Sequence, residues 1–206
     1  MFLSRRKFLN YINCTGLTAI STPLFGSIQS SDNHHLLNYF KFSVGEIKIT
    51  VVSDGGFQLP ISSIDINSSE ENLKKHLKHY HMQEDHIYMN TNLAVIEVED
   101  KKLLIDVGSG SRFIGNTGKL FDNLSKANID PESITNVFLT HAHPDHILGI
   151  RDDFDETIFP DAEFMISEKE YGWWTKKNRV NEVDETFMQM VLWAQNSLNA
   201  IPEISL

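Results

Sequence analysis

The sequence has a single cysteine, Cys14, and no long run of apolar residues. One cysteine cannot form a disulfide within the chain, and a membrane-spanning helix needs about 18 or more apolar residues in a row. These absences exclude a disulfide-stapled scaffold and a membrane span in the mature chain. The remaining composition, 206 residues with 41% hydrophobic, is that of a globular protein with one sizeable core.

Cations are also scarce. The chain has 18 Lys and Arg against 28 Asp and Glu, which gives a formal net charge of −10. Nucleic acid binding depends on clustered cations that neutralise phosphates, and no basic patch interleaved with aromatic residues is present. We therefore expect no nucleic acid partner, and the acidity is expected to serve solubility.

The N-terminus departs from this acidic character. Arg5, Arg6 and Lys7 precede a mildly apolar stretch, and no acidic residue comes before Asp32. The segment SRRKFL resembles the twin-arginine export signal, in which paired arginines are followed by Phe-Leu. A basic tail that is not exported is the alternative interpretation.

This resemblance predicts three regions: a signal peptide at 1–30, a linker at 31–38 and a folded domain at 39–206. Arg5 and Arg6 would be recognised by the export machinery, so the mature protein is expected in the periplasm or outside the cell. Cys14 would leave with the signal.

Hydrophobic periodicity predicts strands first and then alternating strands and helices. Apolar residues alternate on both sides of Gly45, which predicts a hairpin that ends at Asp54-Gly55-Gly56. Further strands are expected at 93–98, 103–107, 134–140 and 162–167, and helices after Ser68 or Ser69 and at 118–128, 167–177 and 183–199. Ser167 and Glu170 fit a capping box. The predicted class is α/β (α+β), a mixed sheet with helices packed outside it.

Four side chains that can bind metal follow the expected strand at 134–140. In the segment THAHPDH they are His141, His143, Asp145 and His146. The first two are two residues apart, so in an extended conformation both point to one side, as one ion requires. Pro144 redirects the chain and leaves the last two for a second ion. Histidine suits zinc, and two such ions can activate a water molecule for hydrolysis.

The segment THAHPDH resembles the signature of the metallo-β-lactamase-fold hydrolases. LLIDVGSG and the run from Gly118 to Gly149 match the same family. VVSDGGFQLP and SEKEYGWW are similar to its lactonase and organophosphate-hydrolase branch. The resemblance covers residues 40–174 and implies an αββα sandwich, of which this chain would hold the N-terminal half.

The resemblance also implies roles for single residues. His141 and His143 would bind a first metal, and Asp145 and His146 a second. Asp145 would in addition orient the attacking water, which makes it the candidate catalytic residue. Asp106 would support the ligands from behind, although a residue that merely ends a strand looks the same in sequence. The expected cofactor is two zinc ions, with manganese or iron as alternatives.

All nine histidines lie at or before His146, whereas the family takes further ligands from later in the fold. We therefore expect an incomplete chain, with the second half of the fold missing, and an exposed apolar sheet face that favours a homodimer. The leading hypothesis is an exported metallo-hydrolase that acts on a lactone, an ester or a phosphotriester. The alternative is a non-catalytic remnant or interaction protein with a partial metal site.

Two other features are open to more than one interpretation. His76, His79 and His81 lie near a predicted helix end, with His86 beyond, and we expect them to be solvent-exposed rather than metal ligands. The pair Trp173-Trp174 is expected in helix packing, with the wall of a substrate pocket as the alternative.

Overall fold

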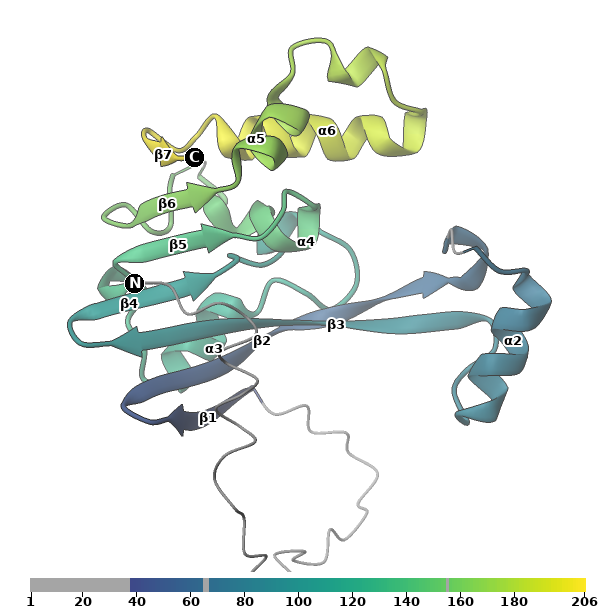
Figure 1. The fold of residues 1–206 in the computed structure, drawn as a ribbon, viewed down its shortest axis with the longest axis horizontal. Coiled ribbons are helices and arrows are strands. Elements are labelled where there is room, and N and C mark those ends of the chain that lie inside the picture. The colour runs from purple at the N-terminus through teal and green to yellow at the C-terminus, as the bar shows by residue number, and fades with distance from the viewer. Residues whose placement is uncertain (1–37, 65–66, 155) are drawn as a thin grey trace, which may run out of the picture. The chain divides into compact units, whose positions relative to one another are not determined.

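Seven strands of the computed structural model pair in chain order into one mixed sheet (Figure 1). The structure describes residues 38–64, 67–154 and 156–206. Antiparallel pairing joins β1 (Tyr39–Val44), β2 (Ile47–Pro60), β3 (His86–Val98) and β4 (Lys101–Ile105). Parallel pairing then adds β5 (Asn136–Leu139), β6 (Glu163–Ile166) and β7 (Ile204–Ser205). The predicted mixed sheet is confirmed.

The helices α3 (Leu120–Lys126), α4 (Pro144–Ile147), α5 (Glu168–Thr175) and α6 (Glu185–Leu198) share one core with the sheet. Alternate strand residues contribute Val52, Leu93, Val95, Leu104, Val137, Leu139, Phe164 and Ile166, and the helices contribute Leu120, Leu124, Ile147, Trp174, Val191, Ala194 and Leu198. Such burial is the main stabilising term in a domain of this kind. The described residues thus form one helical layer and one sheet of the expected αββα arrangement.

The opposite face of the sheet carries apolar side chains that are partly exposed to solvent. Pairing places Phe40 opposite Val51 and Phe42 opposite Ile49, so these residues share one face, and Phe138 lies on the same face. Phe40 is 57% exposed and Phe138 is 38% exposed. The expected exposed apolar face is therefore present.

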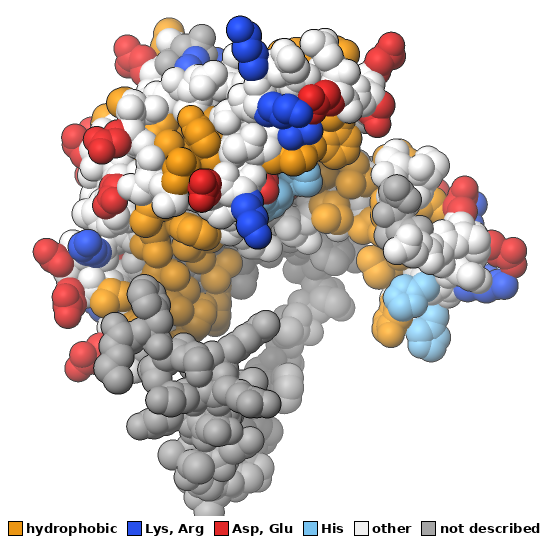
Figure 2. All heavy atoms as spheres, turned by 45° about the horizontal axis from the view of Figure 1, so that its top comes forward, with side chains coloured by type: hydrophobic (Ala, Val, Ile, Leu, Met, Phe, Trp, Pro, Cys, Tyr) orange, Lys and Arg blue, Asp and Glu red, His pale blue; other side chains and the backbone are white. Residues whose placement is uncertain are grey.

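The outer halves of β2 and β3 extend beyond the sheet as an arm that carries α2 (Glu70–His79), as Figure 1 shows. The arm has a small core of its own, formed by Ile61, Leu73 and Leu77 against Ile87. Ser69 caps α2 by accepting a hydrogen bond from the Asn72 backbone. The exposed histidines of the arm stand apart from a second, partly covered group of histidines in the body (Figure 2).

The predicted end of the first hairpin at Asp54-Gly55-Gly56 is wrong. A bulge between Ser53 and Gly55 allows β2 to continue to Pro60. Gly55 has φ +98°, and a Cβ there would lie 1.9 Å from the Asn116 carbonyl oxygen. Glycine is required here by a close approach of two backbones, which gives the same sequence signal as a turn.

Asp54 is fully buried beside this bulge, where its carboxylate ties three segments together. It accepts hydrogen bonds from the backbone N–H groups of Ser109 at 2.9 Å and Leu120 at 2.9 Å, and from Gly118 at 3.3 Å. It therefore joins β2 to the loop after β4 and to the first turn of α3.

Other strand boundaries in the structure differ from the predicted ones. β3 begins at His86 rather than at residue 93, because the arm lengthens it. β4 ends at Ile105, two residues before the predicted end, because Asp106 adopts a left-handed backbone. Within the described residues, the helices are all too short or too polar to cross a membrane. The predicted signal peptide and almost all of the predicted linker lie outside the described residues.

We expect Asp54→Ala to lower the free energy of unfolding by at least about 3 kcal/mol, because it leaves three backbone donors without their acceptor. Urea denaturation followed by circular dichroism measures the change. Asp122→Ala, which removes an exposed acid from α3, is the matched control and should cost less than about 1 kcal/mol. Equal losses in both variants would contradict the assigned role of Asp54.

Candidate metal centre

The metal-binding candidates lie where the parallel strands end. Leu104 pairs with Val137 and Leu139 pairs with Ile166, so β4, β5 and β6 bring their carboxyl ends to the same edge of the sheet. Asp106 follows β4, the segment 140–146 follows β5, and α5 follows β6. Ligand sites commonly form at this edge because three loops meet there.

His141 and His143 form the first pair of candidate ligands. His141 Nε2 lies 3.1 Å from His143 Nδ1. Two nitrogens bound tetrahedrally to one zinc ion at about 2.0–2.1 Å would be roughly 3.3 Å apart, so the observed spacing fits a shared ion. Burial lowers the pKa of His141, and the neighbouring His146 and His143 lower it further. A neutral imidazole is the form that binds metal.

Asp145 and His146, on the short helix α4, form the second pair. Asp145 Oδ2 lies 3.2 Å from His146 Nε2. Burial works against the charged imidazole, but hydrogen bonds with Asp106 and Asp145 outweigh it and raise the pKa of His146 to about 9. Burial also works against the charged form of Asp145, yet the hydrogen bond and charge of His146 lower its pKa. Without metal, the protonated imidazole of His146 therefore forms an ion pair with the Asp145 carboxylate.

Asp106 contacts both the backbone and the ligand candidates. Its Oδ1 accepts a hydrogen bond from the Thr140 backbone at 2.7 Å. Its Oδ2 lies 2.8 Å from the Thr140 hydroxyl and 2.8 Å from His146 Nδ1. Asp106 is 4% exposed and has φ +58°, an uncommon conformation that is often found at functional sites. Asp106 therefore both ends β4 and supports a candidate ligand.

The Thr140 hydroxyl links Asp106 to His141 through hydrogen bonds. Its hydroxyl lies 3.0 Å from His141 Nδ1. Because a carboxylate only accepts, the hydroxyl donates to Asp106 and accepts from His141 Nδ1–H. This assignment leaves the lone pair of His141 on Nε2, the atom that faces His143. His146 likewise turns Nδ1 toward Asp106 and Nε2 toward Asp145, the arrangement found for histidine ligands that a carboxylate orients.

The loop after β4 also holds α4 through backbone contacts. Val107 N–H donates to the His146 carbonyl and Gly149 N–H donates to the Gly108 carbonyl. A Cβ at Gly149 would lie 1.9 Å from the Val107 carbonyl oxygen, so only glycine allows this approach.

The four candidates do not converge on a single point. Among the described residues, no three His, Cys, Asp or Glu side chains have the geometry to hold one metal ion. They divide instead into two pairs with spacings of 3.1 and 3.2 Å. Imidazole and carboxylate donors in such pairs fit zinc.

The structure also places the other histidines and the tryptophan pair. His76 and His79 on α2, and His81 just after it, are exposed as expected. His86 Nδ1 pairs with Asp85 at 2.7 Å. Trp174 is 3% exposed and packs edge-on against His143, while Trp173 is 38% exposed under the guanidinium of Arg179. Trp174 thus belongs to the core and to the edge of the site at once.

Sequence reasoning missed three residues that support this site: Asp54, Thr140 and Glu170. Asp54 belongs to the segment Asp54-Gly55-Gly56, whose residue types are typical of turns. Thr140 precedes His141 directly, and its hydroxyl could have been recognised as a partner for a ligand. Glu170 was assigned to helix capping, whereas its carboxylate accepts a hydrogen bond from the Ala142 backbone.

Comparisons with known proteins concern the family and the fold. Residues 88–181 match the family model described as the metallo-beta-lactamase superfamily. No curated protein sequence matches the chain.

Solved structures with similar folds include AidC, described as a dizinc quorum-quenching lactonase in complex with a product, N-hexnoyl-L-homoserine. It is 30% identical with a TM-score of 0.75, over 82% of this chain and 60% of AidC. The hydrolase AbOPH of the beta lactamase superfamily is 24% identical with a TM-score of 0.70, over 79% of this chain and 57% of AbOPH.

A probable metal-dependent hydrolase from Staphylococcus aureus is 23% identical with a TM-score of 0.56, over 66% of this chain and 52% of that protein. This chain therefore spans between a half and two thirds of the length of these proteins. Residues 88–181 of this chain therefore match the metallo-β-lactamase superfamily, and the fold is similar to that of the dizinc lactonase AidC.

Proposed function

We propose that this protein is an exported zinc hydrolase that opens a lactone or a related ester. The observation that carries the proposal is the pairing of the four candidate ligands, at 3.1 Å for His141 and His143 and at 3.2 Å for Asp145 and His146. The similarity to AidC, a dizinc lactonase, supports both the metal and the substrate class.

Each residue has a distinct task in this proposal. His141 and His143 would hold one zinc ion and Asp145 and His146 the other, while Asp106 keeps Nδ1 of His146, and Thr140 keeps Nδ1 of His141, turned away from the metals. Two bound zinc ions supply Lewis acidity and a water molecule that is deprotonated near neutral pH. The Asp145 carboxylate, whose pKa is lowered, would accept a hydrogen bond from the attacking water.

The surroundings of His143 favour a substrate with an apolar portion. The rings of Trp174 and Phe187 lie 5.6 and 6.4 Å from the ring of His143, and Phe187 is 36% exposed. Aromatic side chains beside a few polar groups are typical of small-molecule sites. We place a lactone first among the candidates, ahead of an open-chain ester or a phosphotriester.

We expect His143→Ala to reduce lactone hydrolysis at least about 100-fold, because one of the paired nitrogens is lost. A pH-stat assay with an N-acyl homoserine lactone measures the rate. His79→Ala, on the arm, should retain the parent rate. A chelator should abolish the activity, and added zinc should restore it.

Hydrolysis that is unaffected by both the chelator and His143→Ala would contradict the proposal. A parent chain that neither takes up zinc nor hydrolyses a lactone, an ester or a phosphotriester would favour the non-catalytic interpretation.

We expect the affinity for zinc to rise with pH. The proton on His146, whose pKa is raised to about 9, must leave before Nε2 can bind metal. Below that pKa, the apparent affinity should therefore fall about tenfold per pH unit as the pH is lowered.

Competition with a chromogenic chelator between about pH 6.5 and 8.5 measures this slope. Asp106→Asn should flatten the dependence, because an uncharged amide no longer favours the protonated imidazole. A parent affinity that is constant over this range would contradict the assignment.

The twin-arginine segment lies outside the described residues, and export stays part of the proposal. We expect replacement of Arg5 and Arg6 together by lysine to keep the protein in the cytoplasm, because the signal is read through paired guanidinium groups. Cell fractionation and immunoblotting measure the distribution. A periplasmic fraction equal to that of the parent would contradict export by this route.

A further inference from the structure

The chain that leaves β5 loses its neighbouring strand just before the candidate ligands. Leu139 pairs with Ile166, after which the chain of β6 turns into α5 at Glu168. The segment that carries His141 and His143 therefore runs on without the parallel ladder. Its backbone donors must find other acceptors, because Ala142 between the two histidines is 0% exposed.

Glu170, in the first turn of α5, provides that acceptor. The Ala142 N–H donates to Glu170 Oε1 at 3.0 Å. A side chain thus takes the place of a strand carbonyl at the point where the sheet ends.

The same carboxylate oxygen also fixes a tryptophan. Trp174 lies one helical turn after Glu170, and its Nε1–H donates to Glu170 Oε1 at 2.6 Å. The Trp174 ring stands edge-on to the ring of His143, with centroids 5.6 Å apart and an angle of 83°. One oxygen atom therefore holds both the backbone between the two histidines and a ring that contacts one of them.

The geometry of α5 shows that Glu170 is not used as an ordinary helix cap. Ser167 Oγ accepts a hydrogen bond from the Glu170 backbone, which is half of the predicted capping box. In a complete box the glutamate side chain reaches back toward the backbone of the capping residue. Here Oε1 faces away from the helix start, toward Ala142, and the predicted box is only half formed.

We propose that Glu170 is a positioning residue that holds His141 and His143 at the spacing of a shared metal ion. Glu170 acts through Ala142 and Trp174 and does not itself contact the metal. The role rests on the proposed zinc function. The physical reason is that a shift of Ala142 moves both histidines, and a shift of Trp174 removes the packing of His143. Neighbours of ligand residues commonly change metal affinity about 10–100-fold when they are removed.

Two experiments on the full chain test the proposal. In the metal-free protein, the hydrogen exchange rate of the Ala142 amide is measured by nuclear magnetic resonance. In a second experiment, zinc affinity is measured by competition with a chromogenic chelator. We expect Glu170→Ala and Glu170→Asp to accelerate exchange at Ala142 at least about tenfold and to weaken zinc binding about 10–100-fold. Aspartate keeps the charge but is one methylene too short to reach Ala142.

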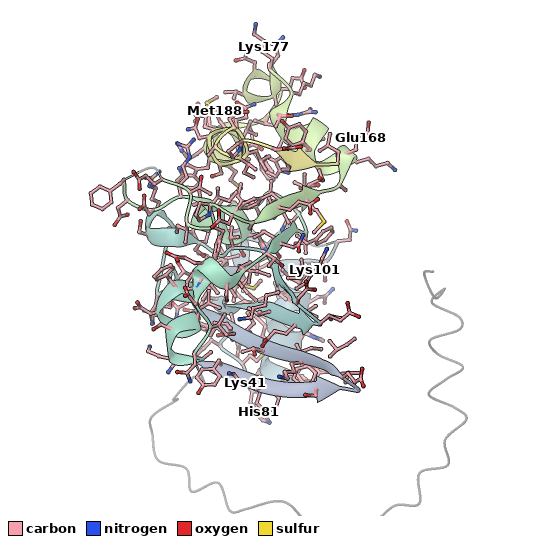
Figure 3. All side chains as sticks on the ribbon, turned by 90° about the vertical axis from the view of Figure 1, so that its left-hand side faces the viewer. Lys41, His81, Lys101, Glu168, Lys177 and Met188 are labelled. Atoms are coloured by element: carbon pink, nitrogen blue, oxygen red, sulfur yellow. The ribbon has the colours of Figure 1, made fainter. Side chains whose placement is uncertain are left out.

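Two further variants separate positioning from charge and from general stability. Glu170→Gln should restore slow exchange, with a zinc affinity within about threefold of the parent, because its amide oxygen accepts both hydrogen bonds. Glu168→Ala, which removes an exposed acid from the same turn of α5 (Figure 3), should leave both measurements unchanged. Glu170→Asp carries the test if the alanine variant does not fold.

Parent-like exchange at Ala142 and parent-like zinc affinity in Glu170→Asp would overturn the proposal. A loss of thermal stability in that variant without a loss of zinc affinity would also overturn it, since the role would then be structural alone. If the parent chain takes up no zinc, the proposed function fails, and the exchange rate at Ala142 still decides whether Glu170 holds the loop.

Discussion

Asp106 leaves β4 with a left-handed backbone and turns its buried carboxylate toward the end of β5, where it meets Thr140 and His146. A carboxylate can accept several hydrogen bonds at once, and this one uses both oxygens on groups of the metal loop. Two consequences follow. The Nδ1 side of His146, and through Thr140 that of His141, is occupied, so both Nε2 atoms face the partners with which they would share an ion. The strained backbone of one residue thus sets the direction of two candidate ligands.

The carboxylates of Asp54 and Glu170 have the same role in the loops that follow the adjacent strands β4 and β5. Each carboxylate accepts at least one hydrogen bond from a backbone N–H group that has left the sheet. Loops that leave the strand ends carry backbone donors that are buried but no longer part of the ladder, and such donors are costly when unpaired. Asp54 serves the loop after β4 and the start of α3, and Glu170 serves the loop after β5. Asp54 and Glu170 therefore act as acceptors for backbone groups outside the ladder, and both come from elements distant in sequence from the groups they serve.

His141 and His146, one from each pair of candidate ligands, differ in protonation state. Burial and neighbouring imidazoles keep His141 neutral, whereas two carboxylates keep His146 charged in the absence of metal. His141 can bind a cation in its neutral form, whereas His146 must exchange a proton for one. A zinc ion at the second pair would replace the single positive charge that now lies between Asp106, Asp145 and His146 by two positive charges, which would match the charges of the two carboxylates.

The sequence by itself determined the mixed sheet, a serine cap for α2 at residue 68 or 69 and the cluster of four metal-binding side chains, because periodicity, caps and ligand spacing are local properties of the chain. Tertiary structure decided the rest. Only strand pairing shows that Asp54-Gly55-Gly56 is a bulge, since a close backbone approach and a turn need the same residues. Only the parallel alignment of β4, β5 and β6 brings Asp106 and Glu170 to the histidines, because hydrogen bonds between residues 28 to 40 positions apart leave no periodic trace in a sequence.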